Sequence, residues 1–322
     1  MRRLAVTYGF IDRPNERSSH RNPTPRGGGS AIVAVVTLSL TVLVLLGRIP
    51  FATFAVLAAG GFAVALVGFI DDRRPVSTRV RLSVHIAAAI WALYWLDGLA
   101  PLRFGDRLID FGWAGYVLGG LGIVWMLNLF NFMDGIDGIA TSEAGFIALS
   151  AAFLLSSGDF TTGIPAIGIV LGAACCGFLV WNWPPAKIFM GDVGSGYLGY
   201  FLACTALAAG RENPTALFVF LVLGAVFVAD ATVTFLRRVA RRERYDVAHR
   251  THAYQHLSRC WGSHKAVTAA VLAINLSVLL PTAAWAIRHP KWAGCAAAAA
   301  SLLLVVAALA AGAGRREGGT AK

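Results

Sequence analysis

The sequence FATFAVLAAGGFAVALVGFIDD, residues 51–72, contains the pattern that decides the fold. Twenty residues without a charge are followed directly by two aspartates, Asp71 and Asp72. A run of about 20 apolar residues is long enough to cross a bilayer as an α-helix, and a charge inside it would be costly. The stretch therefore predicts a transmembrane helix that ends on a pair of carboxylates at the membrane surface.

The composition of the whole chain favours many such helices. Of its 322 residues, 57% are hydrophobic and 14% are charged, whereas a soluble domain is about 45–50% apolar and about 25% charged. These values exclude a disordered chain, a collagen-like repeat and a typical soluble enzyme. Five cysteines without C-x-x-C spacing, and the lone His85 inside an apolar run, are interpreted as packing residues.

Ten segments are predicted to cross the membrane, so the predicted fold class is an all-α, polytopic integral membrane protein. Of the 28 Lys and Arg residues, 22 fall in connections on the same side as the N-terminus. Because positive residues stay on the cytoplasmic side, both termini are predicted to be cytoplasmic. The predicted spans are about 30–48, 51–70, 80–97, 113–131, 138–156, 164–182, 194–209, 215–236, 266–287 and 292–312.

The domain organisation follows from these spans. Residues 1–29 are predicted to form a cytoplasmic N-terminal segment with a phosphate-binding loop. Residues 30–312 form the transmembrane domain, with a large cytoplasmic loop at 237–265, and residues 313–322 form a cytoplasmic tail. The net charge of +11 is then explained by topology and not by binding to nucleic acid.

The polar residues gather on the predicted cytoplasmic face in five patches, which favours a catalytic or binding face. The first patch is DRPNERSSHRNPTPRGGG, residues 12–29. It places Arg17, Arg21 and Arg26 beside flexible glycines, an arrangement that suits a phosphate or diphosphate. A solvated basic leader in front of the first span is the alternative interpretation of this patch.

The second and third patches carry acids. The second is the aspartate pair at the end of the span quoted above, whose mutual repulsion a divalent cation or nearby arginines would relieve. The third is NLFNFMDGIDGIA, residues 128–140. Asn131 and Asp134 share a helix face if the helix continues through them, and Asp137 follows. Two acids and an amide beside glycines suit contacts to a metal or a ribose.

The fourth patch is NWPPAKIFMGDVGSG, residues 182–196. Asp192 lies in a glycine-rich turn in front of the seventh predicted span, where glycine allows a ligand to approach the backbone closely. Phe189 is a candidate for stacking on a base. The sequence is not a phosphate-binding Walker A motif, because G-x-x-x-x-G-K-[ST] is absent.

The fifth patch lies in the longest predicted cytoplasmic loop, at residues 237–259. His249, His252 and His256 are spaced so that one helical face could present all three. Zinc binding is a minority interpretation, because no cysteine or acid with standard zinc spacing lies nearby. Donors aimed at a diphosphate, together with Arg250, fit the patch better.

In this order, the five patches resemble the polyprenyl-phosphate N-acetylhexosamine-1-phosphate transferases (glycosyltransferase family 4). This family includes the phospho-MurNAc-pentapeptide transferase of peptidoglycan synthesis and the transferases that initiate O-antigen and related glycans. The resemblance covers about residues 9 to 260, and the histidine motif HRTHAYQH is closer to the O-antigen-initiating branch. The matching sequences are DRPNERSSH with PTPRGGG, the Asp71–Asp72 pair, NLFNFMDGIDG, FMGDVGSG and the histidine-containing loop.

The resemblance implies roles for individual residues. Asp192, together with Asn131, would hold Mg²⁺, with Mn²⁺ as an alternative ion, and Phe189 would stack on uracil. The residues implied in catalysis are Asp71, Asp72, Asp192, His249 and His252. The residues implied in substrate binding are Asn131, Asp134, Asp137, Asn182, Phe189, Arg26 and Arg250.

The activity implied by the resemblance is transfer of an N-acetylhexosamine-1-phosphate from a UDP-sugar to undecaprenyl phosphate, with release of UMP. It would initiate O-antigen or another cell-envelope polysaccharide at the bacterial inner membrane, with the active site facing the cytoplasm. The partners would be the UDP-sugar, the lipid phosphate and membrane lipid, without nucleic acid, and a homodimer is compatible with them. The peptidoglycan transferase remains an alternative, as does a secondary transporter, although a transporter would place its polar residues near the midplane.

Overall fold

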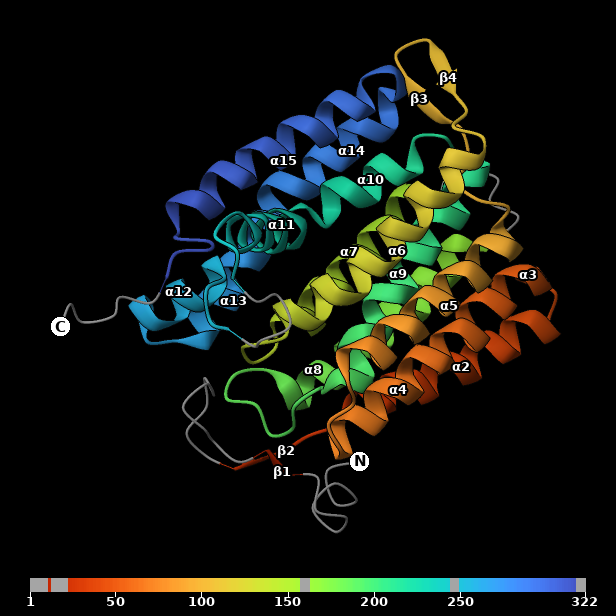
Figure 1. Cartoon of the computed structure of the whole chain (residues 1–322). Helices are drawn as coiled ribbons and strands as arrows, with labels where there is room; N and C mark the ends of the chain where they lie inside the picture. The colour runs from red at the N-terminus through yellow and green to blue at the C-terminus, as the bar shows by residue number, and fades with distance from the viewer. Residues whose placement is uncertain (1–10, 13–22, 157–162, 244–248, 317–322) are drawn as a thin grey trace.

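The apolar runs of the sequence form helices that lie side by side in one bundle (Figure 1). The structure, a computed structural model, describes residues 11–12, 23–156, 163–243 and 249–316. The first half of the chain forms β1 (Ile11–Asp12), β2 (Thr24–Pro25), α2 (Gly29–Leu45), α3 (Phe51–Phe54), the π-helical turn η1 (Ala55–Gly60), α4 (Gly61–Arg73), α5 (Thr78–Leu96), β3 (Leu102–Phe104), β4 (Arg107–Ile109), α6 (Trp113–Met133) and α7 (Ile139–Leu155). The second half forms α8 (Ile164–Asn182), α9 (Asp192–Glu212), α10 (Ala216–Leu223), α11 (Ala225–Ala240), α12 (Ala253–Trp261), α13 (His264–Ile274), the π-helical turn η2 (Asn275–Leu279), α14 (Leu280–Arg288), the 3₁₀ turn η3 (Pro290–Trp292) and α15 (Ala293–Ala310).

Each predicted span coincides with one helix or with consecutive helices, which confirms the all-α, polytopic fold class. Within the described residues, six helices are long and apolar enough to cross a membrane, or seven if the bent pair α10–α11 is one span. The other three predicted spans coincide with α5 and with the shorter apolar helices α2 and α7. The total of ten crossings therefore stays a prediction.

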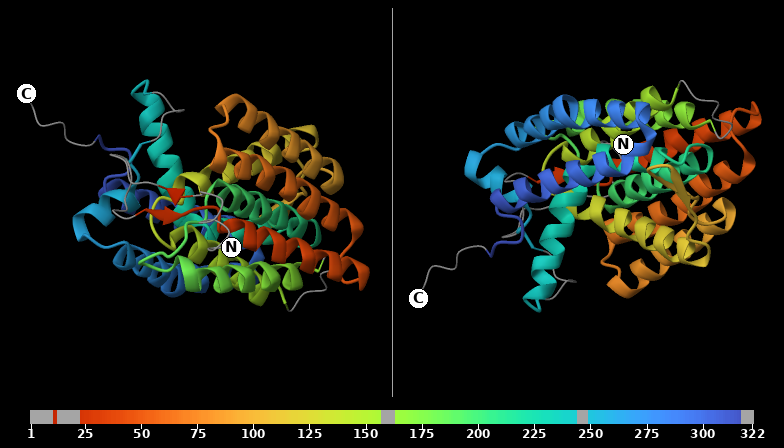
Figure 2. Two further views of the ribbon diagram at one scale, coloured as in Figure 1. Left: turned by 90° about the horizontal axis from the view of Figure 1, so that it is seen from below. Right: turned by 90° about the horizontal axis from the view of Figure 1, so that it is seen from above.

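The predicted span 215–236 differs from the structure, because it is not one straight helix. Helices α10 and α11 meet at Gly224 at an angle of 70°. Helix α11 consequently projects out of the bundle (Figure 2). Both arms are apolar, so hydropathy gives no sign of the break between them.

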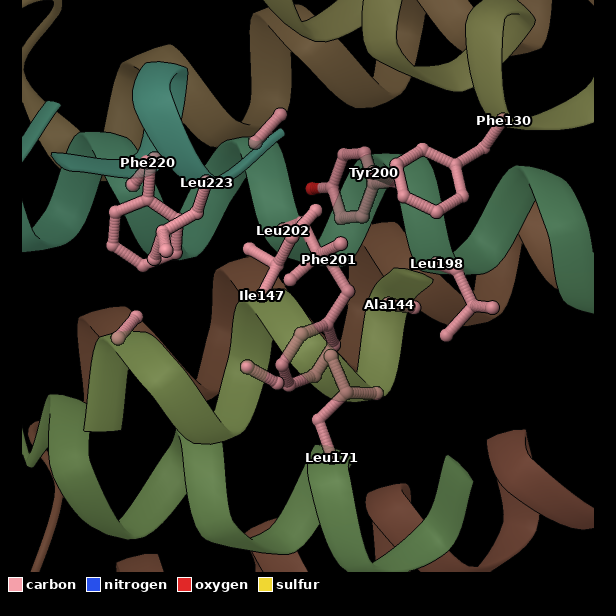
Figure 3. Close-up of a cluster of buried hydrophobic side chains, with 14 of the residues drawn as sticks. Phe130, Ala144, Ile147, Leu171, Leu198, Tyr200, Phe201, Leu202, Phe220 and Leu223 are labelled. Atoms are coloured by element: carbon pink, nitrogen blue, oxygen red, sulfur yellow. The ribbon is translucent and has the colours of Figure 1, made fainter. Parts of the chain in front are cut away.

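Helix α9 forms the centre of the bundle. Every residue from Val193 to Gly210 is buried, and α2, α4, α6, α7, α8 and α10 all pack against it. Figure 3 shows Tyr200 and Phe201 of α9 packed among apolar side chains of the neighbouring helices. Helix α9 also begins two residues before the predicted span, at Asp192, so this acid belongs to the helix itself.

The sequence patches gather at one end of the bundle. In Figure 1, β2, the connection after α8 and helix α12 lie at this end, whereas the β3–β4 hairpin lies at the opposite end. The N–H groups of Gly28 and Gly29 donate to the carbonyl oxygens of Phe189 and Met190, each at 2.9 Å, which joins the first patch to the fourth. We call this region, which carries Arg26, the connection 183–191 and α12, the motif end.

A buried polar contact joins α7 to the kinked helix α13–α14. Asn275, the first residue of the π-helical turn η2, donates from its amide to Glu143 Oε2 at 2.5 Å. Both residues are fully buried. A carboxyl group removed from water is costly unless hydrogen bonds replace its solvation, so each of these residues depends on the other.

We expect Asn275→Leu to lower the free energy of unfolding by roughly 1–3 kcal/mol, because it leaves the Glu143 carboxyl buried without its donor. The double variant Glu143→Leu with Asn275→Leu should lose less stability than Asn275→Leu alone, because it removes both polar groups. Thermal unfolding of the purified protein in detergent measures both changes. A double variant that is less stable than either single variant would contradict the interpretation.

Candidate active site

Three carboxylates and two arginines form one network at the motif end. Arg26 places its Nε 2.8 Å from Asp72 Oδ1 and its Nη2 2.8 Å from Asp192 Oδ1. Arg81 places its Nη1 3.0 Å from Asp71 Oδ2 and 3.3 Å from Asp192 Oδ2. The network connects the segment before α2, the end of α4, the start of α5 and the start of α9. The structure therefore brings together acids that lie 120 residues apart in the sequence.

Asp72 also caps the central helix. Its side chain is fully buried and accepts the backbone N–H groups of Asp192 at 2.9 Å and Val193 at 3.2 Å. The first N–H groups of a helix have no partner within the helix and favour a negative charge. Gly191 precedes them with a φ of +77°, and a Cβ there would collide with the Asp72 carboxylate. This position therefore requires glycine.

Asp71 has a different environment from its neighbour. It accepts the backbone N–H of Val76 at 2.6 Å and pairs with Arg81, so it shapes the connection between α4 and α5. Its side chain is 13% exposed, whereas that of Asp72 is fully buried. The two adjacent acids therefore have separate tasks, and only Asp71 is open to solvent or to a ligand.

The third patch lies beside this network. Helix α6 ends at Met133, so Asp134 is the first residue after the helix and does not share a helical face with Asn131. The Asn131 amide donates to Ser195 Oγ on α9 at 3.2 Å. Burial, and then the negative charge of Asp192, raise the pKa of Asp134 well above its usual range. These two effects favour the neutral carboxyl form of Asp134.

Asn182, the last residue of α8, holds the connection 183–191 in place through side-chain hydrogen bonds. Its amide donates to the Ile188 carbonyl oxygen at 3.1 Å, and its oxygen accepts the Thr141 hydroxyl at 2.9 Å. It is only 3% exposed. In this structure its side chain thus positions the segment that carries the half-buried Phe189, which itself donates a backbone hydrogen bond to Pro25 at 2.8 Å.

Asp137 braces the same connection from another side. Its Oδ2 accepts the Ala186 N–H at 3.0 Å, and its Oδ1 lies 3.4 Å from His264 Nδ1 at the start of α13. Thr268 donates to the Asp137 carbonyl oxygen at 3.1 Å. Asp137 is therefore joined to the site through the fourth patch and α13, and its carboxylate is engaged within the protein.

The histidines do not lie on one helical face, so that interpretation of their spacing is wrong. Helix α12 begins at Ala253, which leaves His249 and His252 in front of it and only His256 within it. The rings of His249 and His252 stack instead, with centroids 5.0 Å apart. Two of the three histidines therefore form a pair, which we call the histidine pair.

The physical reason is Asp230 on α11, a residue that sequence reasoning missed. Its buried carboxylate accepts the backbone N–H groups of Ala253 at 2.9 Å and Tyr254 at 3.1 Å, and it lies 3.3 Å from His252 Nδ1. It therefore fixes the start of α12 and the ring of His252 together. The Tyr254 hydroxyl donates to the Phe132 carbonyl oxygen at 2.8 Å, which ties α12 to the third patch.

Arg81 and His85 on α5 were also missed as site residues. With Asn131 and Asp192 they line a small cleft between α4, α5, α6 and α9 that has room for about one water molecule. His85 is buried, as predicted for a packing residue, but its Nδ1 has no hydrogen-bond partner within the described part of the chain. The sequence signal that could have identified Arg81 and His85 as site residues is their spacing of four residues, which places them on one face of an otherwise apolar helix.

Three predicted arginines remain. Arg250 lies between His249 and His252 in the sequence and is half-buried, and its carbonyl oxygen accepts a hydrogen bond from Arg259 at 3.0 Å. Arg17 and Arg21 lie outside the described residues.

The sequence of this chain is similar to that of known proteins. The family described as glycosyl transferase family 4 matches residues 54–210. A decaprenyl-phosphate N-acetylglucosaminephosphotransferase of Mycobacterium tuberculosis is 31% identical over 84% of this chain and 74% of its own length. The chain belongs to glycosyl transferase family 4.

Two further relatives of this family 4 protein carry different names. A probable undecaprenyl-phosphate N-acetylglucosaminyl 1-phosphate transferase of Bacillus subtilis is 28% identical over 82% of this chain and 74% of its own length. A phospho-N-acetylmuramoyl-pentapeptide-transferase of Heliobacterium modesticaldum is 31% identical over 74% of this chain and 76% of its own length. The family match runs from the end of α3 to α9 and contains all three carboxylates of the network.

For this family 4 protein we expect Asp72→Asn to be more damaging than Asp71→Asn. The first change weakens both the cap of α9 and the contact to Arg26, whereas the second affects a partly exposed acid. Removing the charge from a buried, paired site typically costs about 3–5 kcal/mol. Asp72→Asn should therefore lower both the unfolding temperature and kcat, and Asp71→Asn mainly kcat. Equal unfolding temperatures for the two variants would contradict this assignment.

Proposed function

We propose that the protein transfers an N-acetylhexosamine-1-phosphate from a UDP-sugar to undecaprenyl phosphate, with release of UMP. The observation that carries the proposal is the network of Asp71, Asp72 and Asp192 with two arginines at one end of a membrane bundle. The names of the relatives support the lipid acceptor and the amino-sugar donor. A lipid phosphate needs a site at the membrane surface, and these residues lie at or beside helix termini at one end of the bundle.

In the proposed reaction, an oxygen of the lipid phosphate forms a bond to the β-phosphorus of the UDP-sugar. The bond from that phosphorus to the bridging oxygen breaks, and UMP leaves with the electron pair. The transition state is crowded with negative charge, so positioning and electrostatic stabilisation carry most of the catalysis. We assign this task to the cations Arg26 and Arg81, with the histidine pair as donors to the diphosphate. Little proton removal is needed, because a phosphate monoester is already largely ionised near pH 7.

Mg²⁺ is the proposed cofactor, with Mn²⁺ as a substitute. Among the described residues, no three His, Cys, Asp or Glu side chains are arranged to hold a metal ion. Mg²⁺ commonly takes only one or two protein carboxylates and completes its shell with water and substrate phosphates. The oxygens of Asp192 and Asn131 fit that mode of binding. When bound, the ion offsets the charge of the diphosphate.

The proposed role is the first step of O-antigen or another cell-envelope polysaccharide, at the cytoplasmic face of the bacterial inner membrane. The charge asymmetry of the loops supports this orientation. The relative named phospho-N-acetylmuramoyl-pentapeptide-transferase favours a second candidate, the corresponding step of peptidoglycan synthesis. The two candidates differ in the sugar donor, which an assay distinguishes.

The test is an assay of the purified protein with undecaprenyl phosphate, Mg²⁺ and a panel of donors, read by the formation of UMP. We expect UMP with at least one UDP-N-acetylhexosamine and only when the lipid phosphate is present. Turnover with UDP-MurNAc-pentapeptide alone would identify the peptidoglycan reaction. Movement of a UDP-sugar across sealed vesicles without UMP would instead support a transporter.

We expect Asp192→Asn to lower kcat by about a hundredfold or more, because it removes charge from the centre of the network. The matched control is Asp106→Asn, an exposed aspartate of the β3–β4 hairpin that pairs with Lys291 at the opposite end of the bundle. This control should retain the kcat of the original protein. Titration of Mg²⁺ against initial rate should show a weakened dependence in Asp192→Asn only. Near-normal turnover in Asp192→Asn would refute the metal assignment.

A further inference from the structure

The chain that follows α15 lies against the segment that holds the histidine pair. In Figure 1 the chain leaving α15 runs back past α12. The backbone N–H of Gly314 donates to the carbonyl oxygen of Thr251 at 2.7 Å. Thr251 lies directly before His252, and its hydroxyl contacts His249 Nδ1 at 2.9 Å. One backbone hydrogen bond therefore connects residue 314 to both members of the pair.

We call residues 313–316 the C-terminal strap, and α11 holds it in place. Arg237 donates to the Ala313 carbonyl oxygen at 2.7 Å, and Arg241 donates to the Gly314 carbonyl oxygen at 2.5 Å. Arg237 lies in the last turn of α11, and Arg241 follows directly after the helix. Backbone carbonyls that receive such charged donors are held more tightly than those that receive neutral ones.

The strap is also packed and not only hydrogen-bonded. Ala313 is fully buried, in a small apolar cluster with Val233 of α11, Ala253 of α12 and Ala308 of α15. Arg316 lies 3.0 Å from Glu243, but its side chain is 72% exposed, so this ion pair contributes little. The strap is therefore fixed by the contacts of residues 313 and 314.

Gly314 fits this place because it has no side chain. Its φ is +68°, which favours glycine, and a Cβ would lie 2.8 Å from Arg237 Cβ and 3.0 Å from Arg237 Cδ. Gly312, two residues earlier, has a φ of +93°, but a Cβ there would meet His256 at 3.5 Å and Arg315 Cδ at 3.6 Å, which are ordinary contact distances. The two glycines share the backbone constraint and differ in the steric one.

Both supports of the histidine pair consequently come from α11. Asp230 holds His252 Nδ1 and the start of α12, while the arginines two turns later hold the strap against Thr251. His252 Nε2 is buried and has no hydrogen-bond partner within the described part of the chain. Because Nδ1 faces a carboxylate that can only accept, Nε2 is the ring atom left for a ligand, and it donates a hydrogen bond to a phosphate oxygen only when the ring carries both protons.

We propose that the C-terminal strap is a positioning element of the active site, in which the Gly314 N–H sets the segment that carries His249 and His252 toward the diphosphate of the donor. This inference rests on the proposed function. The strap does not touch the substrate, and it acts through the placement of the histidine pair. A misplacement of about 1 Å at a catalytic group is enough to cost about a hundredfold in rate.

The test is a double-mutant cycle between Gly314→Ala and His252→Asn, measured as kcat and as KM for both substrates. We expect Gly314→Ala to lower kcat roughly tenfold or more in the original protein, with the KM for undecaprenyl phosphate unchanged within twofold. In the His252→Asn background the same change should cost less than twofold, because the group that it positions is already absent. Equal losses in both backgrounds, or no loss in the original protein, would overturn the inference.

Two further variants separate positioning from folding. Gly312→Ala is the matched control for backbone strain: it should lower the unfolding temperature, because alanine is strained at a positive φ, but should retain the original kcat. If Gly314→Ala does not fold, Arg241→Met removes the bond to the Gly314 oxygen without changing the backbone and should show the same coupling to His252. An original protein that releases no UMP with any donor defeats the proposed function, whereas UMP release that is insensitive to both Gly314→Ala and Arg241→Met defeats only the strap.

Discussion

The rest of the structure depends on the two arginines that bridge Asp71, Asp72 and Asp192. Three carboxylates this close repel one another, and desolvation at the end of a membrane helix makes the repulsion worse. Arg26 and Arg81 each contact two of them, so the charges can be buried only if four segments meet. The contacts that permit burial of these charges therefore also assemble the site. Asp192 takes part in them as the first residue of the central helix, where Asp72 accepts its backbone N–H.

This network has a consequence for an anionic substrate. Two arginines do not balance three carboxylates. A UDP-sugar and a lipid phosphate would bring further negative charge to the same place. A divalent cation held by the carboxylates would resolve this conflict, because it would offset their charge and leave the arginines available to the phosphates.

The sequence predicts those features that are local. Apolar runs locate the helices of the predicted spans, and the one-sided distribution of acids predicts that distant patches meet, as Asp71, Asp72 and Asp192 do. Tertiary contacts account for what it misses. The break at Gly224 lies within a segment that is apolar enough to be one span. The histidine spacing suggested one helix face, but the helix starts only at Ala253, because Asp230 caps it from another helix.

Asp230 and Arg81 share the reason why sequence patterns overlooked them. A single acid within an apolar span and a single arginine at a helix start are both explained by topology until their partners are known. The 70° bend explains the position of Asp230, because it directs α11 across the motif end. There α11 contacts both the start of α12, through Asp230, and the chain after α15, through Arg237. The acids are fixed by the central bundle and the histidines by α11, and the bond from Tyr254 to Phe132 joins the two parts. The relative position of the two parts is therefore the geometrical variable on which catalysis between them would depend.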